Sequence, residues 1–159
     1  MKLSIVDRPS FTVVGLQIHT VPMSPEIPAL WQKFVPRLDE IENPAEPRVS
    51  YGVMRQGPEG MASLEYLAAV SVREVGDLPL GMVSLTLPAG AYARFAYPLS
   101  GLAAGFGEIF GQLLPSSDHV QRPGPYFERY GTSFDPGDPS SIVEVYLPVS
   151  PRTGGAGQG

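Results

Sequence analysis

The chain has 159 residues, of which 43% are hydrophobic and 17% are charged, and its formal net charge at pH 7 is -5. This length suits one domain with its own hydrophobic core, or two small, closely packed modules. The acidic balance and the lack of a Lys/Arg cluster argue against a nucleic-acid-binding surface, because such a surface must neutralise phosphates. The chain has no cysteines and two histidines, so disulfides, thiolate chemistry and His-based metal sites are not expected.

The apolar segments predict a cytoplasmic protein without a membrane partner. Residues 1–9 hold no apolar run long enough for a signal peptide. The most apolar region, 81–114, is interrupted by prolines and charged residues, so it is not expected to span a bilayer. The glycine-rich residues 150–159 are predicted to form a disordered tail.

The first half of the chain predicts the element order β-α-β-β. Residues 11–20 are rich in β-branched residues and form the first expected strand. Apolar residues at helical spacing then predict a helix over 25–38, with Pro36 distorting its last turn. Two further strands are expected at 49–55 and 63–72.

The same order restarts in the second half. A long strand is predicted at 82–97, bent near residues 88–90. A helix is predicted at 99–114, although each of its glycines costs a helix up to about 1 kcal/mol relative to Ala. The remaining strands are expected at 126–130 and 142–147.

Several identical residues in the two halves are separated by the same 79 positions. The matched pairs are Pro9 and Pro88, Pro36 and Pro115, Asp39 and Asp118, Pro44 and Pro123, Tyr51 and Tyr130, Gly52 and Gly131, and Glu65 and Glu144. An internal duplication is therefore predicted, with chance similarity in a proline-rich chain as the alternative. It implies an α+β fold of two β-α-β-β units, at about 9–73 and 82–149. The units would be related by a pseudo-twofold axis, with antiparallel sheets around a central cleft and helices outside.

The last strand has two different faces. Alternation places Val143 and Val145 on one face, which suits a core, and Glu144 and Tyr146 on the other. If the second face is covered, Glu144 must be paired, protonated or matched by a cation. The alternative is an edge strand whose Glu144 points into water. Pro148 is predicted to end the strand.

The duplication makes Glu65 equivalent to Glu144, and Tyr51 equivalent to Tyr130. Tyrosines around a carboxylate suit a lipophilic cation, through charge pairing and attraction to the ring faces. They also suit a proton-transferring carboxylate with a raised pKa. Ordinary strand packing is the alternative for the two tyrosines, and a solvent-exposed position is the alternative for Glu65.

Two further residues are candidates for a pocket. Glu128 shares a strand face with Tyr126 and Tyr130. Trp31 lies on the apolar stripe of the first helix, where it belongs either to the core or to a pocket wall. Tyr66 is expected to face the helices as a core residue. The sequence contains neither a P-loop nor a Gly-x-Ser-x-Gly nucleophile elbow.

The span from Phe11 to Pro148 resembles the GyrI-like small-molecule-binding domain, which is also the effector-binding domain of AraC- and MerR-type multidrug-responsive activators. The resemblance rests on the order and spacing of several stretches rather than on one motif. These stretches are Phe11–Gly15, Ile27–Phe34, Tyr51–Val53, Glu65–Ala69, Leu87–Ala93, Phe127–Tyr130 and Val143–Pro148.

The resemblance implies two SHS2-like β-α-β-β modules around a ligand cleft. It also implies binding of hydrophobic, often cationic or aromatic compounds, with no cofactor or metal. Glu144 matches the acidic residue of the family pocket, and Tyr51, Tyr130 and Tyr146 match its lining. The family includes drug-sequestering proteins, a gyrase inhibitor, and hydrolases of cyclopropane-bearing genotoxins that use a Glu with an aromatic partner.

The sequence thus predicts a stand-alone ligand-binding module over residues 1–149, because no helix-turn-helix segment precedes Met1. Its expected partner is a small molecule and not nucleic acid, and the chain is expected to be a monomer or to have a protein partner. One alternative is a hydrolase of strained electrophiles in which Glu144 activates water. Another is a protein-interaction module such as a gyrase modulator.

Overall fold

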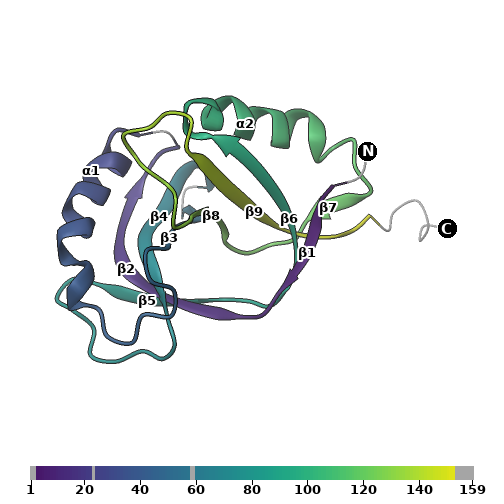
Figure 1. Cartoon of the computed structure of the whole chain (residues 1–159). Coiled ribbons are helices and arrows are strands. Elements are labelled where there is room, and N and C mark those ends of the chain that lie inside the picture. The colour runs from purple at the N-terminus through teal and green to yellow at the C-terminus, as the bar shows by residue number, and fades with distance from the viewer. Residues whose placement is uncertain (1–2, 23, 58–59, 153–159) are drawn as a thin grey trace.

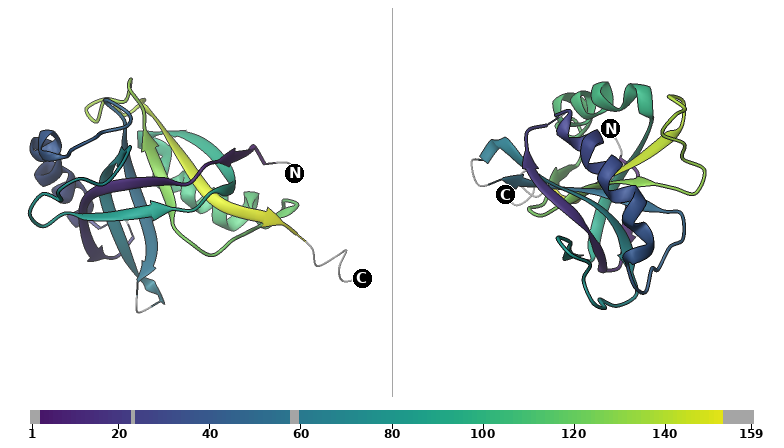
Figure 2. Two further views of the ribbon diagram at one scale, coloured as in Figure 1. Left: turned by 90° about the horizontal axis from the view of Figure 1, so that it is seen from below. Right: turned by 90° about the vertical axis from the view of Figure 1, so that its left-hand side faces the viewer.

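The computed structural model describes residues 3–22, 24–57 and 60–152, and all structural statements below concern these residues. The chain forms a curled antiparallel sheet, with two helices outside the curl (Figures 1 and 2). The strands are β1 (Ile5–Arg8), β2 (Phe11–Thr20), β3 (Ser50–Gly57), β4 (Gly60–Val72), β5 (Val83–Leu87), β6 (Gly90–Pro98), β7 (His119–Gln121), β8 (Tyr126–Tyr130) and β9 (Ile142–Pro151). The helices are α1 (Glu26–Phe34) and α2 (Leu102–Glu108).

The strand order within the sheet is β1-β6-β9-β8-β3-β4-β2-β5, and β7 pairs with the end of β9. Strands β3 and β8 pair at the centre and join the two halves into one sheet, where the sequence predicted separate sheets. The outermost strand on each side comes from the other half of the chain, since β1 pairs with β6 and β5 pairs with β2.

Alternation along the strands gives the sheet a helix-covered face and an opposite face. Under α1, Leu30 and Phe34 pack with Met54, Tyr66 and other side chains of β3 and β4. Under α2 and the segment that follows it, the buried residues include Ile109, Val145 and Leu147. The opposite face buries Val13, Tyr51, Leu67, Phe127 and Tyr146. The face with Val145 and Leu147 is therefore a core face, as predicted.

The helices deviate from the predicted ranges where their sequences disfavour α-helix. The first helix becomes a 3-10 segment at Val35–Glu40, because Pro36 cannot donate a backbone hydrogen bond. The predicted helix at 99–114 begins with a 3-10 turn, continues as α2 and ends as a π-helical segment, Ile109–Leu113. Its glycines and this mixed hydrogen bonding are consistent with a weak intrinsic helix preference.

Strands β2 and β8 have the predicted bounds, and other strands differ. The long strand predicted at 82–97 is divided into β5 and β6, and β6 begins at Gly90, whose φ of 146° favours glycine. Pro148 does not end β9, which continues to Pro151. Pro148 pairs with Tyr92 at the end of the β6–β9 ladder, and the Pro148 carbonyl accepts a 2.8 Å hydrogen bond from the Arg122 N–H.

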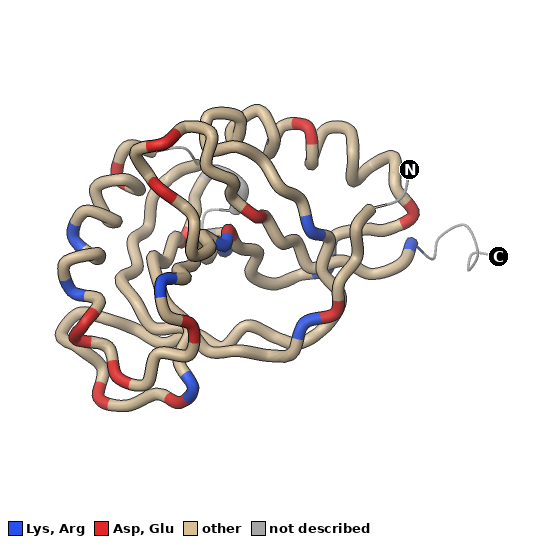
Figure 3. Tube along the Cα trace, in the orientation of Figure 1, with Lys and Arg blue, Asp and Glu red and all other residues tan. Residues whose placement is uncertain are grey.

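The C-terminal part of the described chain belongs to the sheet. Ser150 and Pro151 of the predicted tail belong to β9, and residues 153–159 lie outside the described residues. Lys and Arg residues are scattered along the trace, with acidic residues among them (Figure 3). None of the helices within the described ranges is long and apolar enough to cross a membrane.

Candidate ligand-binding site

A large cavity lies on the helix-covered face of the sheet. Its volume is about 1430 Å³, which exceeds the roughly 300–1,000 Å³ that is usual for small-molecule pockets. Helix α1 contributes Trp31, and α2 and the segment after it contribute Phe106 and Phe110. Strands β3 and β8 contribute Met54 and Tyr126. The wall is therefore mainly apolar and aromatic.

Glu128 is the one acidic side chain among the described residues that line this cavity, and its exposed fraction is 6%. The Tyr130 hydroxyl donates a hydrogen bond to Glu128 Oε1. The Tyr66 hydroxyl donates to the same oxygen at 3.4 Å and accepts a 2.9 Å hydrogen bond from Trp31 Nε1. The four side chains form a connected network from α1 to β8, which we call the Glu128 network.

Burial raises the pKa of Glu128 to about 7, against the opposing effect of the hydrogen bonds from Tyr130 and Tyr66. Burial, and then the charge of Glu128, raise the pKa of Tyr66 and of Tyr130 well above the usual value. Near neutral pH the tyrosines therefore keep their protons and donate, while Glu128 is divided between its neutral and ionised forms.

Aromatic rings surround the carboxylate. The ring of Tyr130 lies edge-on to Trp31 at 5.5 Å between centroids, and 4.8 Å from Phe134 on the loop that follows β8. Ring faces attract cations through their quadrupole. The site can therefore offer a cation both a carboxylate and aromatic surfaces.

Gly52 leaves space for the Glu128 network. It stands opposite Glu128 in the β3–β8 ladder, and a Cβ atom there would lie 2.2 Å from the Tyr66 hydroxyl oxygen. We expect Gly52→Ala to displace that hydroxyl and to lower the free energy of unfolding by about 1–3 kcal/mol, as overpacking does. Urea unfolding followed by Trp31 emission measures this. Gly111→Ala is the control, since its Cβ would meet no atom within 4 Å; equal stability of the two variants would contradict the prediction.

Three of the residues predicted from the sequence to bind ligand meet at this cavity: Trp31, Glu128 and Tyr130. Tyr66 and Tyr126 line it with them. Tyr66 does face the helices, as predicted, and it is both a core residue and part of the cavity wall.

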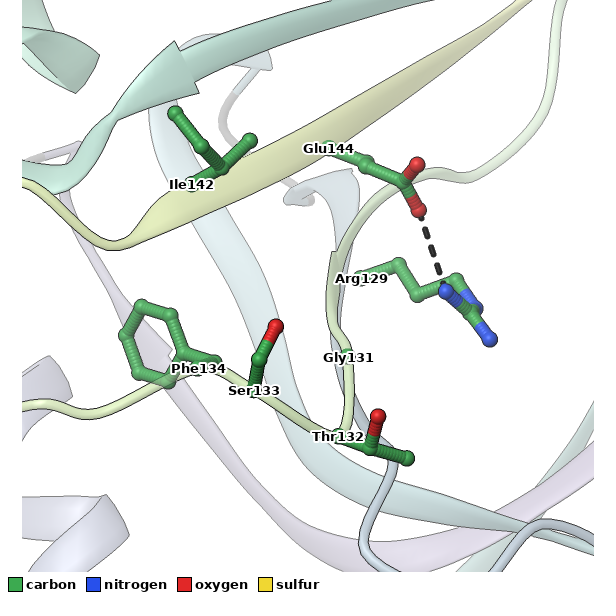
Figure 4. Close-up of a pocket in the computed structure, with 7 residues that line it drawn as sticks. All are labelled: Arg129, Gly131, Thr132, Ser133, Phe134, Ile142 and Glu144. Carbon is green, nitrogen blue, oxygen red and sulfur yellow. Dashed lines mark hydrogen bonds and ion pairs between the residues drawn. The ribbon is translucent and has the colours of Figure 1, made fainter.

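Glu144 lies elsewhere, in a pocket of about 270 Å³ that it lines with Arg129 (Figure 4). Its carboxylate accepts hydrogen bonds from Arg94, and from Arg129 at 3.1 Å. Burial raises the pKa of Glu144, but the two arginines more than offset this effect and hold it below its usual value. Among the outcomes expected for a covered Glu144, the structure has the paired one.

The other predicted residues are also outside the large cavity. Tyr51 is buried on the opposite face, where its hydroxyl donates a 2.6 Å hydrogen bond to Glu46. Tyr146 stacks on Phe127 with 4.9 Å between ring centroids. Glu65 pairs with a histidine and an arginine of the neighbouring strands. A ligand-binding role for these residues and for Glu144 stays a prediction.

Comparison with known proteins agrees with this architecture. Residues 1–150 match the family model of the GyrI-like small molecule binding domain. The transcriptional regulator BrlR of Pseudomonas aeruginosa is 36% identical over 152 residues, which cover 94% of this chain and 56% of the regulator. The chain thus spans about half the length of that relative.

Solved structures share the fold at low sequence identity. The structure of SAV2435 bound to tetraphenylphosphonium aligns with a TM-score of 0.73 at 18% identity, over 100% of both chains. The C-terminal domain of EcmrR aligns with a TM-score of 0.66 at 12% identity, over 94% of this chain and 98% of that domain. With its curled antiparallel sheet, its two helices and the family match over almost its whole length, this chain belongs to the GyrI-like small-molecule-binding domains and is related to those of transcriptional regulators.

Proposed function

We propose that this domain binds a lipophilic small molecule, cationic or aromatic, in the 1430 Å³ cavity, and that Glu128 is the acidic residue of the site. The observation that carries the proposal is a buried carboxylate in an aromatic cavity, with tyrosine hydroxyls as its hydrogen-bond donors. In the described residues, no Lys or Arg forms an ion pair with Glu128. Burying a carboxylate is costly unless a cation accompanies it.

A ligand cation would supply the missing charge. It would replace the proton that burial favours on Glu128, and the rings of Trp31 and Tyr130 would contact its apolar surface. The hydrolase alternative gains no comparable support, because the Glu144 carboxylate already accepts hydrogen bonds from two arginines. Within a regulator, such a site would act as the effector-binding part.

A pair of ions with the same shape and opposite charge tests the proposal. SAV2435 is bound to tetraphenylphosphonium in its structure, so we choose this cation and the tetraphenylborate anion as probes. At pH 8 we expect the cation to raise the melting temperature and to quench the emission of Trp31, the single tryptophan. The anion should bind at least about tenfold more weakly, because it meets the ionised Glu128. Equal binding of both ions would contradict a carboxylate-based site.

We also infer that the domain arose by internal duplication with pseudo-twofold symmetry. The strand order supports this. β1 immediately precedes β2 in the first half, as β5 immediately precedes β6 in the second, and β1 pairs with β6 while β5 pairs with β2. The registers agree as well. Moving both members of the pair Ile5↔Ala93 by 79 positions, one forward and one back, yields Val14↔Ser84, which is also a pair.

A further inference from the structure

The large cavity also has a basic residue in its wall. Arg48 is the one positively charged side chain among the described residues that line it, and it is exposed, whereas Glu128 is buried. The cavity therefore has two charges of opposite sign in different surroundings. The rest of its described lining is uncharged.

Arg48 has no partner within the described part of the chain. Each of the other arginines described makes a hydrogen bond, an ion pair or a ring contact. Arg48 makes none of these. Its guanidinium keeps its donors available for a planar acceptor such as a carboxylate.

The backbone holds Arg48 in a conformation that arginine seldom adopts. Its φ is 61°, and the Val49 N–H donates to the Glu46 carbonyl at 3.3 Å across the turn. Pro47 followed by a positive φ matches a type II turn, in which glycine is preferred at the position of Arg48. A strained residue persists when its surroundings determine the conformation, and such residues concentrate at functional sites.

The surroundings of the turn do determine its conformation. On one side, the Glu46 carboxylate accepts hydrogen bonds from the Tyr51 and Ser71 hydroxyls, both at 2.6 Å. On the other side, the Val49 side chain is buried. Contacts of Glu46 and Val49 thus stabilise the turn on both sides of Arg48, which lies at the cavity wall.

We propose that Arg48 is the anion-recognising part of the ligand site, so that favoured ligands carry an aromatic cation at one end and a carboxylate or similar anion at the other. This inference rests on the proposed function. Arg48 precedes Gly52 by four residues, and Gly52 is the cross-strand partner of Glu128. The Cα atoms of Arg48 and Gly52 are therefore at most about 13 Å apart, and Glu128 lies beside Gly52 on the neighbouring strand. An elongated amphoteric molecule can span Arg48 and Glu128, and the cavity is larger than a compact monocation requires.

Two related dyes test this at pH 8. Rhodamine 110 carries a xanthylium cation and a free carboxylate, and rhodamine 123 is its methyl ester. We expect Arg48→Gln to weaken rhodamine 110 about three- to fivefold, as measured by fluorescence anisotropy, because it removes an exposed ion pair. Rhodamine 123 should be unaffected, and Arg48→Lys should retain part of the preference for the acid.

Lys33→Gln is the matched control, since it removes one positive charge from the exposed face of α1 and does not line the cavity. Weaker binding of rhodamine 110 alone, in Arg48→Gln but not in Lys33→Gln, supports the inference. Equal loss in both variants, or no loss in either, overturns it while binding of rhodamine 123 by Glu128 stands. If neither dye binds, or Glu128→Gln leaves both affinities unchanged, the proposed function itself fails.

Discussion

Cation binding is expected to strengthen about tenfold between pH 6 and pH 8 and to lose most of this dependence in Glu128→Gln. With a pKa of about 7, Glu128 is ionised in roughly one tenth of the molecules at pH 6 and nine tenths at pH 8. A cation that needs the ionised form binds in proportion to that fraction. At pH 8 the variant should also bind tetraphenylphosphonium at least about tenfold more weakly, because it lacks a buried opposite charge. Titration of Trp31 emission at each pH measures both effects.

Glu144→Gln is the matched control for this experiment. It removes the same acid from the smaller pocket, where Arg94 and Arg129 are the partners of Glu144. Its affinity and pH dependence should equal those of the wild type. The reverse pattern would make Glu144 the acidic residue that binds the cation, as the sequence predicted, and would remove Glu128 from the site.

Glu128→Gln is also expected to stabilise the protein, by an amount that depends on pH. The pKa of Glu128 in the folded chain, about 7, is above its ordinary value of 4.5. Its contribution to stability is thus fully present below about pH 4.5 and is lost as the pH rises through 7. The difference in free energy of unfolding between Glu128→Gln and the wild type should therefore be about 2.5 kcal/mol more favourable to the variant at pH 8 than at pH 5. Urea unfolding at the two pH values, without ligand, measures the difference.

Glu74→Gln serves as the control for stability, because it removes an exposed carboxylate. It should show little change between the two pH values. A gain in Glu128→Gln that is the same at pH 5 and pH 8 would mean that the carboxylate is ionised over the whole range. If Glu128→Gln both raises the free energy of unfolding and weakens cation binding, Glu128 is a residue retained for function at the expense of stability.

Much of the fold could be predicted from local patterns. The bounds of β2 and β8 follow from runs of β-branched and aromatic residues, and the change to a 3-10 segment at Val35 follows from Pro36. The short strands β1 and β7 were not predicted, because their four and three residues carry too little periodicity. They exist through pairing with β6 and β9, which are distant in sequence.

The choice between Glu128 and Glu144 could not be made in this way. Alternation correctly groups Glu128 with Tyr126 and Tyr130, and Glu144 with Tyr146. Alternation does not say which face of each strand the helices cover, since that depends on the strand order and on the side of the sheet on which α1 and α2 pack. Nor could the sequence pattern reveal the positive φ of Arg48, which arises from the turn before β3.

The exchange of outer strands between the two halves has a consequence for how the chain folds. β1 is synthesised before β6, and this hydrogen-bonding partner becomes available only after residues 90–98 have left the ribosome. Closing such distant pairs costs loop entropy before any contact compensates for it, which slows folding to milliseconds or longer in β-rich domains of this kind. β1 therefore has no strand partner until the second half is made, and the outer strand on each side of the sheet pairs only with a strand of the other half.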